Sequence, residues 1–185
     1  MGQRIVRATL TDVSARKTIE SALYFAAQRA AEGRADHAAF ARDLAYFLCA
    51  TLKLDHALVL RHLEEGGLQV LGAVADGYPL ELDPKAASVL AQGRDAGRED
   101  VRVTAEGARA LKPHATLLAE WRAESYLRVS LWDAHGEAIG HIGDTGRRAL
   151  AHPERARPVL QVAAVRAAQE VEGMRAALTL QRQQE

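Results

Sequence analysis

The fold is decided by the stretch ESYLRVSLWDAHGEAIGHIGDTG, residues 124–146. Its first part, Ser125–Trp132, is rich in β-branched and aromatic residues, as β-strands are. The four residues DAHG at 133–136 have the composition of a turn, and Glu137–Gly143 follows as a second strand. The stretch therefore predicts an antiparallel hairpin with a short turn.

After Pro153 the apolar period changes from that of a strand to about 3.6, which predicts a long helix to the C-terminus. Small and apolar residues recur there at heptad spacing, at Leu160, Ala164, Ala167, Val171, Met174 and Leu178, and Gln181 continues the spacing. About 30 residues of helix extend roughly 45 Å, which exceeds what a small sheet covers. We expect the first half to pack on the sheet and the second half to project and dimerise.

The hairpin and the start of the last helix resemble the end of a GAF domain, a family of bacterial sensory modules. The resemblance is carried by residues 124–127, 133–136 and 139–142 and by the Ala-rich helix start, and it extends back to about Asp36. It implies an α+β fold with an antiparallel sheet of five or six strands. Helices His37–Lys53 and Pro153 onward would cover one face, and a ligand pocket would lie on the other.

The segments between these parts predict the rest of the sheet and its cover. A first hairpin is predicted from His56–Leu63 and Leu68–Ala75, joined by the turn EEGG. A helix is expected at Pro84–Gln92, a short strand at Val101–Val103 and a helix turn at His114–Trp121. Long connections of this kind are often functional, and in GAF domains this region walls the pocket.

The N-terminal part predicts connectors. Residues Arg4–Leu10, RIVRATL, are predicted to form a short strand that has no partner of its own. With the helix that follows, this strand resembles the end of a PAS domain; the alternative is that it pairs with the GAF-like sheet. The expected division is a PAS remnant at 1–13, a connector helix at 14–33, a GAF-like domain at 34–170 and a signalling helix at 171–185.

Composition excludes several classes of protein. The chain has 185 residues, 48% of them hydrophobic, which suits one domain with appendages. A formal net charge of zero argues against a nucleic-acid surface held by bulk electrostatics. The single cysteine, Cys49, excludes an internal disulfide and a zinc cage of several thiolates. No secretory signal and no apolar run of ~20 residues are found, so we expect a cytoplasmic chain without a membrane partner.

Alternation along the strand Ser125–Trp132 gives the candidate ligand site. Its odd-numbered apolar residues are predicted to face the core helices, and the pocket side receives Tyr126, Arg128, Ser130 and Trp132. A turn that sets Trp132 opposite Glu137 also sets Arg128 opposite His141. An arginine fork suits carboxylate or phosphate, so a small anionic ligand is expected. The alternative is a solvated Arg128 on an open sheet face.

Catalysis and metal binding are not expected. The seven histidines form no H-x-x-x-H or H-E-x-x-H pair, although His56 and His62 share one face of a predicted strand. The sequence has no phosphate-binding Gly loop and no paired catalytic carboxylates, and it identifies no cofactor.

The expected assembly is a homodimer through both helical ends. Its predicted seam residues are Ile19, Leu23, Ala26, Val171, Met174 and Leu178. The resemblance implies a sensory or relay module between an upstream PAS domain and a downstream output domain, usually a histidine kinase or a cyclic-di-GMP enzyme. The alternative is a ligand-free dimerisation scaffold.

Overall fold

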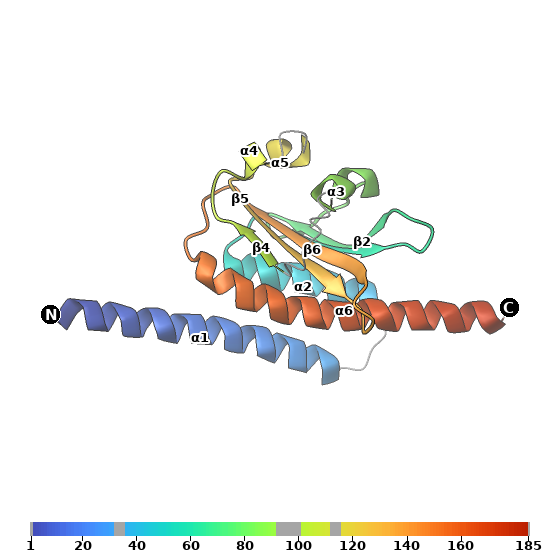
Figure 1. Ribbon diagram of the computed structural model, residues 1–185, viewed down its shortest axis with the longest axis horizontal. Helices are drawn as coiled ribbons and strands as arrows, with labels where there is room; N and C mark the ends of the chain where they lie inside the picture. Colours follow the sequence, from blue (N-terminus) through green and yellow to red (C-terminus); the bar gives the residue numbers. More distant parts are fainter. Residues whose placement is uncertain (1, 32–35, 92–100, 112–115, 185) are drawn as a thin grey trace.

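The computed structural model describes residues 2–31, 36–91, 101–111 and 116–184. Helices and strands are arranged as an α+β fold (Figure 1). In chain order the elements are α1 (Gly2–Ala31), α2 (His37–Leu52), β1 (His56–His62), β2 (Leu68–Ala75), β3 (Tyr78–Pro79), α3 (Pro84–Ala91), β4 (Val101–Thr104), α4 (Ala108–Leu111), α5 (Thr116–Glu120), β5 (Ser125–Trp132), β6 (Ala138–Gly146) and α6 (Pro153–Gln184).

The strands form one six-stranded antiparallel sheet in the order β3-β2-β1-β6-β5-β4. The hairpins β1–β2 and β5–β6 are joined at the centre by the pairing of β1 with β6. Both predicted hairpins are therefore confirmed, as is the short strand at Val101. Helix α3 occupies the described part of the segment predicted as a helix at Pro84–Gln92, and α5 occupies that of the segment His114–Trp121. The predicted end at Gln92 and the predicted start at His114 lie outside the described residues.

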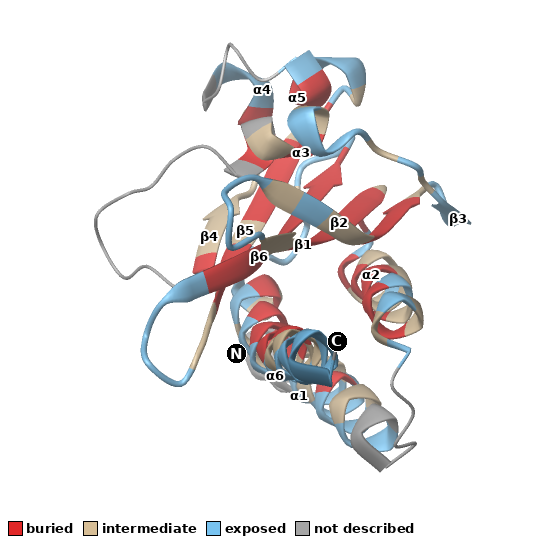
Figure 2. Cartoon of the chain, turned by 90° about the vertical axis from the view of Figure 1, so that its right-hand side faces the viewer, coloured by how far each residue is buried: buried red, intermediate tan, exposed pale blue. Residues whose placement is uncertain are grey.

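The sheet lies between two layers of helices (Figures 1 and 2). We call the side covered by α2 and α6 the long-helix face, and the side covered by α3, α4 and α5 the short-helix face. Leu127, Val129 and Leu131 belong to the core on the long-helix face, whereas Tyr126 belongs to the core on the other side. The alternation predicted for β5 is thus confirmed.

Local sequence explains why α2 begins and ends where it does. Asp36 caps it, since its carboxylate accepts a hydrogen bond of 3.0 Å from the Ala39 N–H. Lys53 ends it in the left-handed conformation, with φ 57° and its N–H bonded to the Cys49 carbonyl. Leu44 and Leu48, four residues apart on one face of the helix, are fully buried against the sheet.

The strand predicted at Arg4–Leu10 is wrong, because residues 2–31 form the single helix α1. The alternative, a strand paired with the sheet, is wrong for the same reason. Strand propensity in RIVRATL is overridden because each added helical residue makes its own backbone hydrogen bond, whereas a strand needs a neighbour. Helix α1 runs beside α6 in the same direction (Figure 1). The division into a remnant, a connector, a domain and a signalling helix stays a prediction.

The register predicted for the second hairpin is also wrong. Trp132 lies opposite Ala138, Ser130 opposite His141 and Arg128 opposite Gly143. Two causes add up: the turn includes residue 137, and the ladder shifts between Leu131 and Trp132, where β6 holds an extra residue. The turn is fixed by Asp133, whose carboxylate accepts 2.9 Å hydrogen bonds from the N–H groups of residues 135 and 137.

Candidate functional site

The short-helix face gathers the side chains predicted for ligand binding. Tyr126, Arg128, Ser130 and Trp132 alternate along β5 with the residues of the opposite core, and His141 lies on the same face of β6. Arg128, Ser130 and Trp132 are half-buried, and His141 is buried. The register correction moves His141 from Arg128 to Ser130, so His141 is a diagonal neighbour of Arg128 rather than its direct partner.

Tyr126 ties the sheet to its cover. The side chain is 3% exposed, and its hydroxyl donates a 2.8 Å hydrogen bond to the Leu90 carbonyl at the end of α3. Burial raises the pKa of Tyr126 to about 12, so the hydroxyl stays protonated. Tyr126 lies on the predicted face of the sheet. Its hydroxyl already donates a hydrogen bond to α3 and is therefore not free to donate to a ligand.

His141 meets a second histidine that the sequence alone did not connect with it. The Nε2 atom of His62 lies 3.3 Å from Nδ1 of His141, and the two rings meet edge to face with centroids 5.2 Å apart. His62 also places Nδ1 3.0 Å from the Ala138 carbonyl oxygen. The available signal was the even spacing of His56 and His62, which puts both on one face of β1. The pairing of β1 with β6, which brings His62 to His141, is a tertiary contact.

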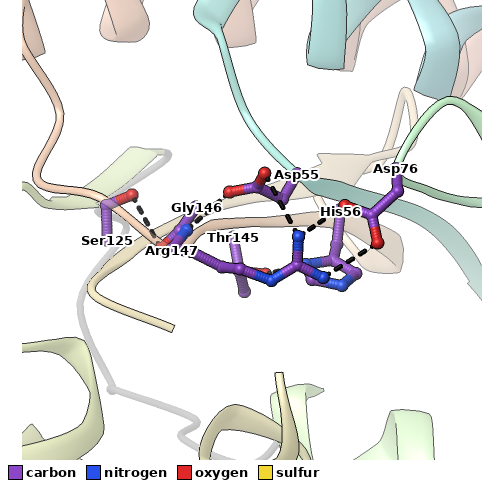
Figure 3. A network of polar contacts seen from close by, with 7 residues as sticks. All are labelled: Asp55, His56, Asp76, Ser125, Thr145, Gly146 and Arg147. Carbon is purple, nitrogen blue, oxygen red and sulfur yellow. Dashed lines mark hydrogen bonds and ion pairs between the residues drawn. The ribbon is translucent and has the colours of Figure 1, made fainter. Parts of the chain in front are cut away.

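A polar network closes the opposite end of the same face (Figure 3). The buried His56 ring lies flat against Trp121, with centroids 4.2 Å apart, and its Nδ1 is 3.0 Å from the Thr145 hydroxyl oxygen. Burial lowers the pKa of His56, and the nearby Arg147 adds to the effect. The His56–Trp121 stack therefore holds the end of α5 against the strand ends with a neutral imidazole.

Arg147 joins that network to two carboxylates. Its guanidinium binds Asp76 through two contacts, of 2.5 and 2.8 Å, and its backbone N–H donates to Asp55 over 2.6 Å (Figure 3). The hydrogen bonds from Arg147 lower the pKa of Asp76. These groups are substantially exposed, so we assign them to fixing the loops at the strand ends.

Two titratable groups lie on the long-helix side. Cys49 is half-buried, and burial, with the charge of Asp144 next in order, raises its pKa to about 12, which marks an unreactive thiol. Asp144 is 0% exposed on β6, where it lies opposite Ala57 and Leu127. Neither of its carboxylate oxygens has a hydrogen-bond partner among the described residues, and burial raises its pKa well above the ordinary value.

The predicted seam residues divide between the inside and the outside of the chain. Val171 is 1% exposed and packs in the core, and Ile19, Ala26 and Met174 are half-buried. Leu23 and Leu178 point outward, at 53% and 37% exposed. The outward surface of α1 and α6 also carries Val13, Tyr24 and Leu180.

The described part of the chain was searched for a metal site and for a membrane-spanning helix, and neither was found. No group of three or more His, Cys, Asp or Glu side chains there is placed to hold a metal ion. Within the same residues, no helix is both long and apolar enough to cross a membrane.

Sheet order, helical layers and the covered short-helix face together define a GAF-like α+β fold. The chain is similar to the crystal structure of the GAF domain of a protein assigned as a sensor histidine kinase, from Pseudomonas syringae pv. tomato. That comparison has a TM-score of 0.67 and 16% sequence identity, and it covers 95% of this chain and 99% of the other. No protein-family profile and no curated protein matches the sequence. The predicted fold class is confirmed.

Proposed function

We propose that this chain is a sensory or relay module of a signalling protein. A small molecule on the short-helix face, or the state of an upstream PAS domain, would change the packing of α1 and α6 in a dimer. A downstream output domain would then respond. The observation that carries the proposal is a set of contacts between the hairpin turns and the distal half of α6.

These contacts involve the strands that form the candidate ligand site. The Ala134 N–H, in the β5–β6 turn, donates a 3.1 Å hydrogen bond to Glu172, and Asp133 lies 3.9 Å from Arg175. The β1–β2 turn adds an ion pair of 3.3 Å between Glu64 and Arg182. Exposed ion pairs stabilise weakly, but their positions matter here. A shift of the strand tips would change the contacts that hold the exit helix.

The entry helix is mechanically connected to the same unit. Ala22 of α1 is buried in the core on the long-helix face, and the Phe25 ring stacks on Phe47 of α2 at 4.7 Å. Helices α1 and α6 lie side by side and extend past opposite ends of the sheet (Figure 1). A rearrangement imposed on α1 from upstream would therefore reach α6 without any ligand, which supports a relay function beside a sensory one.

Native mass spectrometry of the freshly purified full chain tests the sensory function. We expect a co-purifying small molecule that is lost on denaturation. Removing and restoring it should change the distance between spin labels at Gln183→Cys in the two copies, in a Cys49→Ala background. Position 183 is exposed on α6 beyond its contacts with the turns. An empty protein would contradict the sensory function and leave the relay function and the ligand-free dimerisation scaffold. A bound molecule whose removal leaves the label distances unchanged would contradict its coupling to α6.

A further inference from the structure

We propose that the outer edge of β2, from Leu68 to Leu71, binds an extended peptide segment of a partner protein that carries basic residues at both ends. The peptide would add a strand to the sheet beside β2, a mode of recognition in which main-chain hydrogen bonds give affinity and alternate side chains give specificity. This interaction needs no ligand on the short-helix face, so it goes beyond the proposed sensory function and is tested separately.

Strand β2 is paired along only part of its outer edge. It has eight residues, whereas β3 has two and pairs with Val74 and Ala75. One further hydrogen bond, of 2.9 Å, runs from the Leu80 N–H to the Ala73 carbonyl. Among the described residues, none pairs with the outer edge of β2 at positions 68–71. The main-chain groups that point outward there are therefore available to another strand.

A β-bulge separates the covered part of this edge from the open part. Val59 of β1 lies opposite Gly72, and Leu60 lies opposite Val70, so Leu71 is an extra residue in β2. The open part is four residues long. That length is enough for pairing in this sheet, because β4 pairs with β5 over four residues.

The open stretch lacks the features that usually keep edge strands apart. Such strands are commonly protected by charged residues, by proline or by a covering element. The open residues read LQVL, with no charge and no proline, and Gln69 is exposed while the other three are half-buried. The opposite edge strand, β4, carries a charge at Arg102, and Figure 2 shows the two edges on opposite sides of the sheet. The edge of β2 is therefore suited to pairing with an uncharged stretch of peptide.

The side chains along the edge specify the centre of that peptide. Leu68 and Val70 pack against the core on the short-helix face, and Leu71 packs against the core on the long-helix face. An added strand places its own side chains beside these on the same two faces, because strand residues alternate. Apolar residues at alternate positions of the peptide would therefore extend the core beside Leu68 and Val70.

The chain around the edge is acidic. Residues 61–85 contain five aspartate and glutamate residues against two arginine and lysine residues. Glu65 lies in the β1–β2 turn before the open stretch, and Glu81 follows Leu80, whose N–H bonds to β2 beyond the other end. Both glutamates are exposed. Opposite charges across an interface favour association and fix its register, so basic residues are expected at both ends of the peptide.

The same charges disfavour a second copy of this chain as the occupant. If two β2 edges paired antiparallel about a two-fold axis, the β1–β2 turn of each copy would approach the segment that follows β3 in the other. Acidic residues would then face acidic residues, which opposes pairing. A peptide with basic ends meets carboxylates at both ends of the open stretch.

NMR titration of the full chain with the synthetic peptide KKVTVTVKK tests the proposal. We expect the amide signals of residues 68–71 to shift and their hydrogen exchange to slow. A peptide with glutamates in place of the lysines, EEVTVTVEE, should bind about tenfold more weakly or not at all, and the double variant Glu65→Lys/Glu81→Lys should lose a similar factor for KKVTVTVKK. Glu106→Lys is the matched control, since Glu106 is an exposed residue that follows β4, and it should bind like the parent chain.

Two N-methylated peptides distinguish strand pairing from attraction between charges alone. Along a strand the N–H groups of alternate residues point to the same side, so methylation of the valine nitrogens blocks one edge of the peptide and methylation of the threonine nitrogens blocks the other. One of these peptides should lose binding and the other should retain it. The proposal is overturned if residues 68–71 do not respond to KKVTVTVKK, or if the two methylated peptides behave alike. It is also overturned if these signals shift with protein concentration alone, because the occupant is then a second copy of the chain.

Discussion

At the scale of single residues, Asp144 is a fully buried carboxyl group whose burial opposes its ionisation. It lies under the long-helix face with no hydrogen-bond partner among the described residues, and its folded pKa is raised well above 3.8. Between pH 3.8 and that raised pKa the folded chain keeps a proton that the unfolded chain has lost. The free energy of unfolding therefore falls as pH rises through this window.

Asp144→Asn should remove that pH dependence, since an amide of the same shape does not ionise. At neutral pH we expect the free energy of unfolding to rise by roughly 1–3 kcal/mol. Urea unfolding followed by circular dichroism between pH 4 and pH 8 checks this, with the exposed Glu106→Gln as the control. If the free energy of unfolding varies with pH equally in Asp144→Asn and in the parent, then the pKa of Asp144 is not raised in the folded chain.

Substitution by alanine should destabilise the chain at one glycine of β6 and have almost no effect at another. A Cβ atom at Gly140 would lie 2.2 Å from the Leu60 carbonyl oxygen, so Gly140→Ala must push β6 away from β1. We expect a loss of about 1–3 kcal/mol of stability, as for overpacked cores. Gly143→Ala meets no atom within 4 Å and should leave stability almost unchanged. Chemical denaturation of both variants measures the difference, and similar losses would contradict the described register.

At the scale of elements, α1 is a helix held to the domain by one side. The buried or half-buried positions among residues 13–28 recur at helical spacing; they are Ser14, Ala15, Thr18, Ile19, Ala22, Phe25 and Ala26. The opposite side carries Leu23 and Tyr24 to the surface. One face of α1 therefore packs on its own domain, and the other face is available for contact with a second copy of the chain.

Ala22→Glu should release α1 from the domain, because a charge would enter a position that is 2% exposed. An unpaired buried charge costs on the order of 3 kcal/mol, so the helix should detach rather than bury it. Hydrogen exchange should then accelerate across residues 13–28. The exposed Ala27→Glu, on the same helix, is the control and should exchange like the parent. Unchanged exchange in Ala22→Glu would contradict the packing of α1.

At the scale of the whole molecule, the ends of α6 differ in what they contact. Val171 belongs to the core, and Glu172 and Arg175 touch the β5–β6 turn. Every side chain from residue 176 to 184 is exposed, including Leu178 and Leu180. An exposed helical end with leucines at the surface is what a dimeric coiled coil would cover.

Leu178→Glu should weaken the proposed dimer, because it places a charge in the predicted apolar seam. Size-exclusion chromatography with light scattering should report a shift toward monomer, with the thermal midpoint of the domain retained. Ala176→Glu changes an exposed residue outside the predicted seam and is the control. Truncation after Arg175 should act like Leu178→Glu. A monomeric parent chain would refute the dimer.

Strand alternation, the two hairpins and the course of α6 were all predictable from the sequence, because each depends on neighbours within one segment. The faces of Arg128 and His141 followed from the same alternation. The sequence could not predict that Arg128 lies opposite Arg102, or that His141 meets His62, because these pairs join strands that no single turn connects.

The helical state of α1 and the register of β5 against β6 became clear only from the structure. Residues 4–10 have the local propensity of a strand, but a strand is stable only with a partner, and a continuous helix needs none. The register depended on a turn closed by the Asp133 carboxylate and on one extra residue in β6. The sequence determined which residues can form elements and which face each one serves. The packing of those elements determined which side chains meet, because contact energy depends on distances that no single segment specifies.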